Sequence, residues 1–279
     1  MTRSTKEVDS GARRASTAQD GGTHDRSGTQ SLARGIRLMR TIATRPQFGW
    51  RLSDLVTACR LDKGTVRRML VCLIEERLVR QHASGQRYFP GPLMYELGLA
   101  LPDNARFQRA AEKQLQSLAR RLGGVTLLLL RSGNEYVCSL RLGTLSLSGL
   151  MVFPGTRRPL FTSVGGVAIL QALGEDEARL VLENNIAQEI AKQGTGRLDG
   201  LCKMREHSAR HGFGVNMGDV VPGVHAFAVP VAGPRQGAFC ALCLIGTAEL
   251  YGEERLPELR AELQASALAL ELEAQNFNM

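Results

Sequence analysis

The stretch LDKGTVRRMLVCLIEER, residues 61–77, decides the fold of the first part of the chain. On a helical wheel of about 100° per residue, its apolar side chains gather on one face. That face consists of Val66, Met69, Leu70, Leu73 and Ile74. The spacing predicts a helix from about Lys63 to Arg77 that buries one side and exposes the other.

The exposed side of this helix carries the residue types that bind DNA. Gly64, Thr65 and Arg68 face away from the apolar stripe, and Arg67 lies at its flank. A recognition helix presents such residues to the major groove from its first two turns. Arg68 suits guanine O6 and N7, and Thr65 suits a base edge or a phosphate. Lys63 and Arg67 suit phosphates. The alternative is a surface helix with ordinary basic residues.

The neighbouring segments favour DNA binding. A helical pattern starts at Ser31 and ends at Pro46, and a second helix begins at the cap-like Ser53. Residues 79–81 and 87–89 flank a glycine-containing turn and predict a hairpin. We therefore predict a winged helix-turn-helix domain over about 31–95, with the helix-turn-helix at about 51–70. The predicted DNA contacts are Ser53, Lys63, Gly64, Thr65, Arg67, Arg68, Arg80 and Arg87.

The charge distribution supports the same interpretation. The chain of 279 residues has a net charge of +8. Residues 31–98 carry 12 Lys and Arg against 5 Asp and Glu, whereas residues 99–279 carry 18 of each. Nearly all the excess charge therefore lies in one quarter of the chain. Such a basic segment is typical of a domain that binds a polyanion.

The remaining composition indicates where the protein resides. Residues 1–30 are polar and predict a disordered tail. The chain has no apolar run of 18 residues and no apolar segment near its start of the kind a secretory signal needs. We expect a cytoplasmic protein whose six cysteines act as small buried hydrophobic residues.

The second part of the chain has an alternating α/β pattern. We predict a linker helix at 96–109 and a separate domain at 110–275. Strands are expected at 125–130, 136–142, 223–231 and 238–245, and helices at 164–173, 175–184, 198–211 and 253–275. Residues 238–245 are apolar throughout, as in a central strand covered on both faces.

These segments resemble the IclR family of bacterial transcriptional regulators. In residues 61–70 the family typically shows Pro-Lys-Ser-Thr-Val-x-Arg-Leu-Leu, and Gly64 replaces the usual serine. Residues 158–170 and 212–231 also resemble segments of that family. The resemblance implies an α+β protein: a winged helix-turn-helix domain, a linker helix and a GAF-like α/β domain that binds an effector. It further implies operator DNA as partner, and dimers that pair into tetramers.

Two segments of the second domain predict an effector pocket. Ser163 caps a helix that opens with two glycines, and the free amides of such a helix suit a carboxylate. The alternative is close packing of Gly165 and Gly166 against a strand. Asn216 and Asp219 lie in a glycine-rich turn before an apolar strand. By position, the family's ligand contacts fall on Val164, Gly165, Asn216, Asp219, Ala226, Cys243 and Ile245.

The residues at these positions favour a particular effector class. Several are less polar than those in family members that bind glyoxylate-like acids, and Phe161 replaces the common histidine. We therefore expect a larger and more apolar ligand, such as an aromatic acid.

Other motifs are weighed against catalysis or metal binding. Cys240 and Cys243 form a CxxC pattern, but on a strand positions i and i+3 point to opposite faces. His207 and His211 lie one helical turn apart without the glutamate of a zinc protease motif. His225 lies beside the predicted pocket, as a polar contact or a core histidine. We expect no cofactor, no metal site and no catalytic residues.

The sequence thus predicts a ligand-responsive, DNA-binding transcriptional regulator, in the setting of a catabolic operon, that forms a homodimer or tetramer. Two alternatives belong to other classes. One is an architectural DNA-binding protein without an effector, and the other is an enzyme tethered to nucleic acid by its basic domain.

Overall fold

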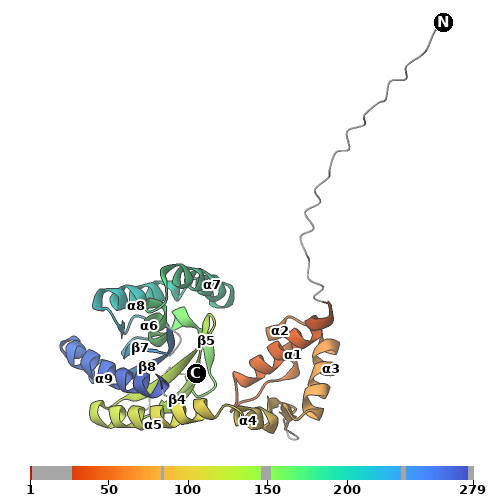
Figure 1. Ribbon diagram of the computed structural model, residues 1–279, viewed down its shortest axis with the longest axis horizontal. Helices are drawn as coiled ribbons and strands as arrows, with labels where there is room; N and C mark the ends of the chain where they lie inside the picture. Colours follow the sequence, from red (N-terminus) through yellow and green to blue (C-terminus); the bar gives the residue numbers. More distant parts are fainter. Residues whose placement is uncertain (2–26, 83–84, 146–151, 234–236, 276–279) are drawn as a thin grey trace.

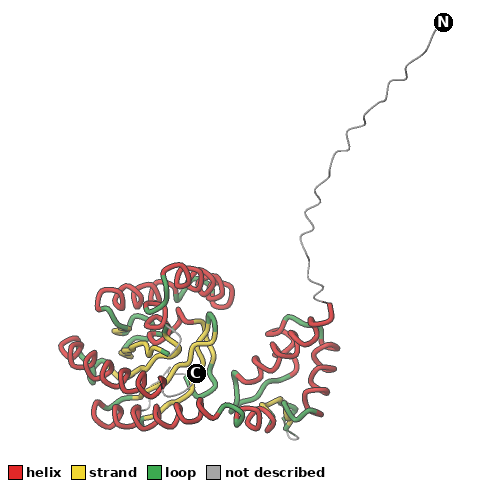
Figure 2. The backbone as a smooth tube through the Cα atoms, in the orientation of Figure 1, coloured by secondary structure: helices red, strands yellow, loops and turns green. Residues whose placement is uncertain are grey.

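The computed structural model describes residues 1, 27–82, 85–145, 152–233 and 237–275. Most of the predicted tail therefore lies outside the described residues. Two domains are joined through a helical connection (Figure 1), and Figure 2 shows that most of the strands lie in the larger of the two.

The smaller domain is a three-helix unit with a hairpin. Its elements are α1 (Ser27–Ala43), α2 (Leu52–Cys59), α3 (Lys63–Glu75), β1 (Val79–Gln81) and β2 (Tyr88–Pro90). Helix α1 begins four residues inside the segment predicted as tail. The strands β1 and β2 pair antiparallel, and Trp50 adds a single bridge to Tyr88. Part of the turn between the strands, residues 83–84, lies outside the described residues.

A single apolar core holds these helices together. Leu38 and Ile42 of α1, Leu55 of α2, and Val66 and Leu70 of α3 are 0–1% exposed. Leu73 is also buried, while Met69 and Ile74 are half-buried at the edge of the same cluster. The apolar stripe predicted for α3 is therefore confirmed.

The connection between α2 and α3 has a backbone conformation that its sequence did not predict. Arg60 adopts a left-handed backbone with φ of 52°, a conformation that usually favours glycine. Its amide donates to the Thr57 carbonyl, and the Leu61 amide donates to Val56. The predicted cap Ser53 lies inside α2, where its hydroxyl donates to Asp54, and the N-cap residue is Arg51. The prediction of Ser53 as the cap was wrong.

Two helices connect the domains. Helix α4 (Pro92–Gly98) and helix α5 (Pro102–Leu122) are separated by Leu99, Ala100 and Leu101. The predicted linker at 96–109 thus covers the end of one helix and the start of the next. Pro102 begins α5, because a proline at the first helical position costs no hydrogen bond.

The larger domain contains a six-stranded antiparallel sheet in the order β5-β4-β3-β8-β7-β6. Its strands are β3 (Val125–Ser132), β4 (Glu135–Leu142), β5 (Arg157–Pro159), β6 (Gly214–Met217), β7 (Val224–Ala232) and β8 (Ala238–Thr247). The short strands β5 and β6 were not predicted. Strand β8 lies between β3 and β7 and is buried along most of its length, as its apolar sequence indicates.

Helices cover both faces of this sheet. On one face lie α6 (Val164–Gln171), α7 (Glu175–Gln193) and α8 (Leu198–His211), and on the other lie α5 and α9 (Leu256–Gln275) (Figure 1). Helix α7 is nine residues longer than predicted. A 3-10 turn at Glu253–Arg255 precedes α9, where the sequence predicted a continuous helix.

The cysteines largely follow their predicted role. All six are free thiols, and Cys243 and Cys240 belong to the two cores on opposite faces of the sheet. Burial raises the pKa of both thiols well above the ordinary value. Cys72 is exposed on α3, so the expectation of burial was wrong for this residue.

None of the helices in the described ranges is long and apolar enough to cross a membrane.

Candidate nucleic-acid interface and effector cavity

Helix α3 lies at the outer edge of the small domain, away from the larger one (Figure 1). Asp62 is its N-cap, and a carboxylate oxygen of Asp62 accepts from the Thr65 amide at 2.8 Å. Hydrogen bonds from the side chain and amide of Thr65 hold the pKa of Asp62 below its usual value. The cap is therefore an ionised carboxylate at neutral pH, which fixes the start of the helix.

The predicted contacts on α3 form one exposed surface. Lys63, Gly64, Arg67 and Arg68 are exposed, and Thr65 is half-buried. Arg68 donates to the Thr65 hydroxyl at 3.2 Å, so this bond orients the guanidinium along the helix surface. Within the described residues, Lys63, Arg67 and Arg68 form no ion pair with an acid. Their charges are thus available to a polyanion.

The two arginines of the hairpin are held by the small domain itself. Arg80 donates to the Pro90 carbonyl at 3.3 Å and lies 5.2 Å from the centre of the Phe89 ring. Arg87 is half-buried and donates to the Phe48 carbonyl at 3.2 Å. Both side chains are therefore fixed at the base of the hairpin. Ser53 is exposed on α2.

The larger domain has a cavity of about 100 Å³, open to solvent on one side, between α6 and the sheet. It receives side chains from β3, β4, β7 and β8 and from the loops that precede α6 and α8. Six of the seven predicted effector contacts line it: Val164, Gly165, Asn216, Ala226, Cys243 and Ile245.

Asp219 does not line this cavity. Its carboxylate accepts from His207 Nδ1 at 3.0 Å and from the Met217 amide at 3.4 Å. Its own amide donates to Asn216 Oδ1 at 3.0 Å. Asp219 therefore positions the turn that brings Asn216 to the cavity.

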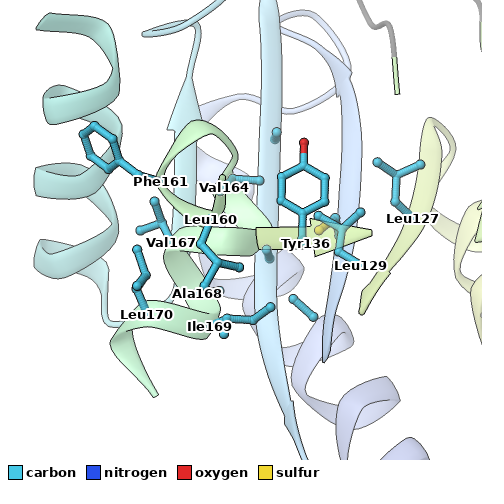
Figure 3. Close-up of a cluster of buried hydrophobic side chains, with 14 of the residues drawn as sticks. Leu127, Leu129, Tyr136, Leu160, Phe161, Val164, Val167, Ala168, Ile169 and Leu170 are labelled. Atoms are coloured by element: carbon cyan, nitrogen blue, oxygen red, sulfur yellow. The ribbon is translucent and has the colours of Figure 1, made fainter. Parts of the chain in front are cut away.

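Phe161 also lies outside the cavity. It is fully buried and points toward α7, away from Tyr136 and Leu129 (Figure 3). Its amide donates to the buried Asn185 side chain at 2.9 Å. The use of Phe161 as a sign of an apolar ligand was wrong, because its ring packs in the core.

Three polar residues that the sequence reading missed line the cavity: Tyr136, Arg158 and Arg197. Burial raises the pKa of the Tyr136 phenol to about 12, so it stays a neutral hydrogen-bond donor. Arg197 donates to the buried Glu189 at 2.9 Å. Tyr136 lies on β4, Arg158 on the edge strand β5 and Arg197 in the loop before α8, so no local sequence motif contains all three. Figure 3 shows the Tyr136 ring among the apolar side chains of this core.

The start of α6 serves two structural purposes. Ser163 accepts from the Gly166 amide at 3.1 Å, which confirms the predicted cap. A Cβ on Gly165 would lie 2.4 Å from Cys243 Sγ, and one on Gly166 would lie 1.9 Å from the Leu160 carbonyl oxygen. Close packing therefore requires both glycines, whichever ligand the helix start receives.

The histidines make internal contacts. His225 Nδ1 donates to the Tyr251 carbonyl at 2.7 Å, and His207 contacts Asp219. The main-chain carbonyl of His211 accepts a hydrogen bond from Arg260.

An exposed cationic helix in a winged helix-turn-helix, joined to an α/β domain with a cavity against its sheet, defines a DNA-binding transcriptional regulator with an effector-binding domain. Residues 31–83 match the model of the IclR helix-turn-helix domain, and residues 101–272 match that of the C-terminal domain of bacterial IclR regulators. The chain belongs to the IclR family.

Individual relatives are distant but cover most of the chain. The transcriptional regulator KipR of Bacillus subtilis is 22% identical over 244 residues, which are 86% of this chain and 95% of KipR. The crystal structure of an IclR family regulator from Brucella abortus is 22% identical, with a TM-score of 0.70, and covers 89% of this chain and 94% of its own.

A third relative has a bound ligand. An IclR homologue from Microbacterium hydrocarbonoxydans, solved in complex with 4-hydroxybenzoate, is 18% identical, with a TM-score of 0.65. The match covers 88% of this chain and 99% of that one. At these identities the structures establish the shared fold.

Proposed function

We propose that the chain binds operator DNA through α3 and the hairpin, and that a small organic acid in the cavity controls this binding. The proposal rests chiefly on one observation: six of the seven predicted contact positions, from four separate elements, line the same cavity. For control, the acid must bind two arrangements of the protein with different affinity, because equal affinity shifts nothing.

We assign a role in DNA binding to each predicted contact by its position on or near α3. Arg68 and Thr65 meet base edges, whereas Lys63 and Arg67 meet phosphates. Ser53, Arg80 and Arg87 contact the backbone on either side, and Gly64 lets the helix approach closely. Phosphate contacts release counterions, so binding weakens steeply with salt.

The cavity suits an acid with an apolar body. Arg158 supplies positive charge, Arg197 adds a guanidinium that is paired with Glu189, and Tyr136 supplies a neutral donor. The first turn of α6 adds amides without intrahelical partners. The walls are mainly Leu, Val, Ile and Ala side chains. By analogy with the relative solved with 4-hydroxybenzoate, we favour an aromatic acid.

The size of the cavity sets a condition on this choice. A cavity of ~150 Å³ accepts benzene in a well-studied engineered protein. The cavity here is about 100 Å³, so an aromatic ring must displace its walls. In our proposal, the displacement of these walls by an aromatic acid is the conformational change that links the cavity to DNA binding at a catabolic operon.

An exposed apolar surface supports self-association. Tyr95, Leu97, Leu99 and Leu101 are 56–72% exposed on α4 and the connection to α5. Helices that expose such a surface usually bury it against a partner. We propose that a second copy covers it in a homodimer, which pairs two DNA-binding domains with two operator half-sites. Leu97→Asp should give monomers in light scattering if this surface is the interface.

The effector proposal is tested by calorimetry with 4-hydroxybenzoate and with glyoxylate. We expect 4-hydroxybenzoate to bind and Arg158→Gln to weaken it at least tenfold. Arg179→Gln, an exposed arginine on α7, is the control and should leave the affinity unchanged. Tight binding of glyoxylate alone would reverse the choice of effector class.

Operator binding is tested by mobility shift with DNA from upstream of neighbouring genes at low ionic strength. Retardation that 4-hydroxybenzoate changes supports the regulator. Retardation that no acid changes favours the architectural alternative. Turnover of an acid, seen by mass spectrometry, would favour the tethered enzyme. No retardation would refute the proposal.

A further inference from the structure

A second cleft, larger than the effector cavity, lies between the two domains. Its volume is about 860 Å³, and α1, the α1–α2 turn, β4, β5 and the end of α7 line it. It is distinct from the effector cavity, which lies inside the larger domain. The cationic side chains that line it come from both domains and face the same space.

The wall of this cleft is strongly cationic. Six basic residues line it, against the single acid Glu135: Arg37, Arg40, Arg45, Arg157, Arg158 and Lys192. Three of the six come from α1 and the turn after it, and three come from the larger domain. Cations gathered in a concave, low-dielectric wall focus the potential and raise the local concentration of anions.

The single acid is already shared between two arginines. Glu135 Oε2 lies 3.0 Å from Arg40 and 3.1 Å from Arg157, and so bridges the two domains. Arg37 and Lys192 form no ion pair within the described residues and are exposed. The cleft thus keeps uncompensated positive charge on both sides of the Glu135 bridge.

The cleft also has an aromatic wall, which includes Trp50. Trp50 is 8% exposed, and its Nε1 is the one buried side-chain donor or acceptor without a partner among the described residues. The Arg45 guanidinium lies 3.9 Å from the centre of the Trp50 ring. Phe48 and Phe153 line the same wall. Aromatic side chains therefore line the cleft beside its cations.

We infer that this cleft binds a small polyanion, of the phosphate-ester or polycarboxylate class, between the DNA-binding and effector domains. Such a ligand neutralises repulsion between the cations of the two domains and holds them together. Arginine suits it because the planar guanidinium binds phosphate and carboxylate oxygens in pairs. The site goes beyond the proposed effector cavity and is a second input to the same molecule.

Arg158 gives the two sites a physical link. It lines both the interdomain cleft and the effector cavity. Two anions that draw on one guanidinium compete for it, so each should weaken binding of the other. Because linkage is reciprocal, the factor is the same in both directions.

The only tryptophan of the chain provides the measurement. Inorganic tripolyphosphate and citrate are titrated separately into the full-length protein at low ionic strength, and the emission of Trp50 is followed. We expect a saturable change with one site per chain. The stronger of the two probes identifies the class, phosphate or polycarboxylate.

A charge-matched pair of variants separates a site from general attraction. Arg37→Gln combined with Lys192→Gln removes two cleft cations that hold no ion pair, and should weaken binding at least tenfold. Arg109→Gln combined with Lys113→Gln removes two exposed cations from α5 and should change it less than twofold. Equal losses in both would overturn the inference, as would the absence of saturation.

The cleft must also be distinguished from the DNA interface. The Arg37 and Lys192 variant should retain DNA binding within twofold, whereas Arg67→Ala should weaken it by a clearly larger factor. If both variants lose DNA binding alike, the cleft is part of the DNA surface and the inference fails. If DNA binding fails in the unmodified protein but Trp50 still titrates, the proposed function fails and the cleft site stands.

Discussion

Helices α3 and α6 begin with the same device and face different surroundings. Each has a capping side chain, Asp62 or Ser163, that accepts from the amide three residues on, and each has glycine at the second helical position. The first helix start is exposed and flanked by cations, whereas the second is buried among apolar walls. The local structure supplies amides, and under the proposed function the surroundings decide whether the partner is a duplex or a small acid.

The difference in packing gives the largest expected effect. Gly166→Ala places a Cβ 1.9 Å from the Leu160 carbonyl, where backbone must move. We expect a loss of about 1–3 kcal/mol or more in the free energy of unfolding. Thermal and denaturant unfolding measure it.

Gly64→Ala is the matched control on α3. Its Cβ would meet nothing closer than 3.3 Å, at the Asp62 side chain. Replacing a helical glycine with alanine should raise the free energy of unfolding by roughly 0.5–1 kcal/mol. A similar loss at both positions would mean that the two helix starts are packed alike.

The exposed start should respond to loss of its cations instead. Arg68→Ala should cost about 1–3 kcal/mol on the preferred operator and less on altered sites, because it removes a base-reading group. Competition between operator variants in a mobility shift measures this loss of preference. Uniform weakening on all sequences would assign Arg68 to the phosphates.

Arg67→Ala should weaken DNA binding uniformly. The slope of log affinity against log salt concentration should fall by about 1, because one phosphate contact is lost. Titrations at several salt concentrations measure the slope. An unchanged slope would show that Arg67 lies off the duplex.

The smallest effect separates the two caps by pH. The lowered pKa of Asp62 means that its stabilising contribution is present above the ordinary pKa of 3.8 and is lost as pH falls through the lower folded value. Ser163 does not titrate. The Thr65 amide resonance should therefore shift in acid, while the Gly166 amide does not.

Asp62→Asn is the control for this titration. Asparagine keeps a capping oxygen but has no proton to gain. A Thr65 shift that persists in this variant would point to another titrating group.

Much of the first domain was predictable from the sequence because its signals are local. The stripe around Val66 predicts the buried face of α3, and hairpin strands follow from residues 79–81 and 87–89. The start of α2 was not predicted correctly, because Ser53 looks like a cap while the backbone places Arg51 there. The left-handed backbone at Arg60 was not predicted, because that conformation usually occurs at glycine and this position is an arginine.

The effector cavity was predictable only in part. The resemblance to the family gave positions on separate elements, and six of them line one cavity. Asp219 and Phe161 could not be placed correctly. The geometry of a turn decides where the Asp219 side chain points, and packing in the core decides it for Phe161. Arg158 and Arg197 reach the cavity from the edge strand β5 and a loop, where no periodicity exists.

The break at Leu99, Ala100 and Leu101 has a consequence for the operator. A continuous helix from α4 to α5 would act as a stiff rod and fix the separation of two paired recognition helices. Residues 99–101 interrupt that rod. If a second copy pairs the recognition helices as proposed, we expect this interruption to let the protein bind operators whose half-sites differ slightly in separation.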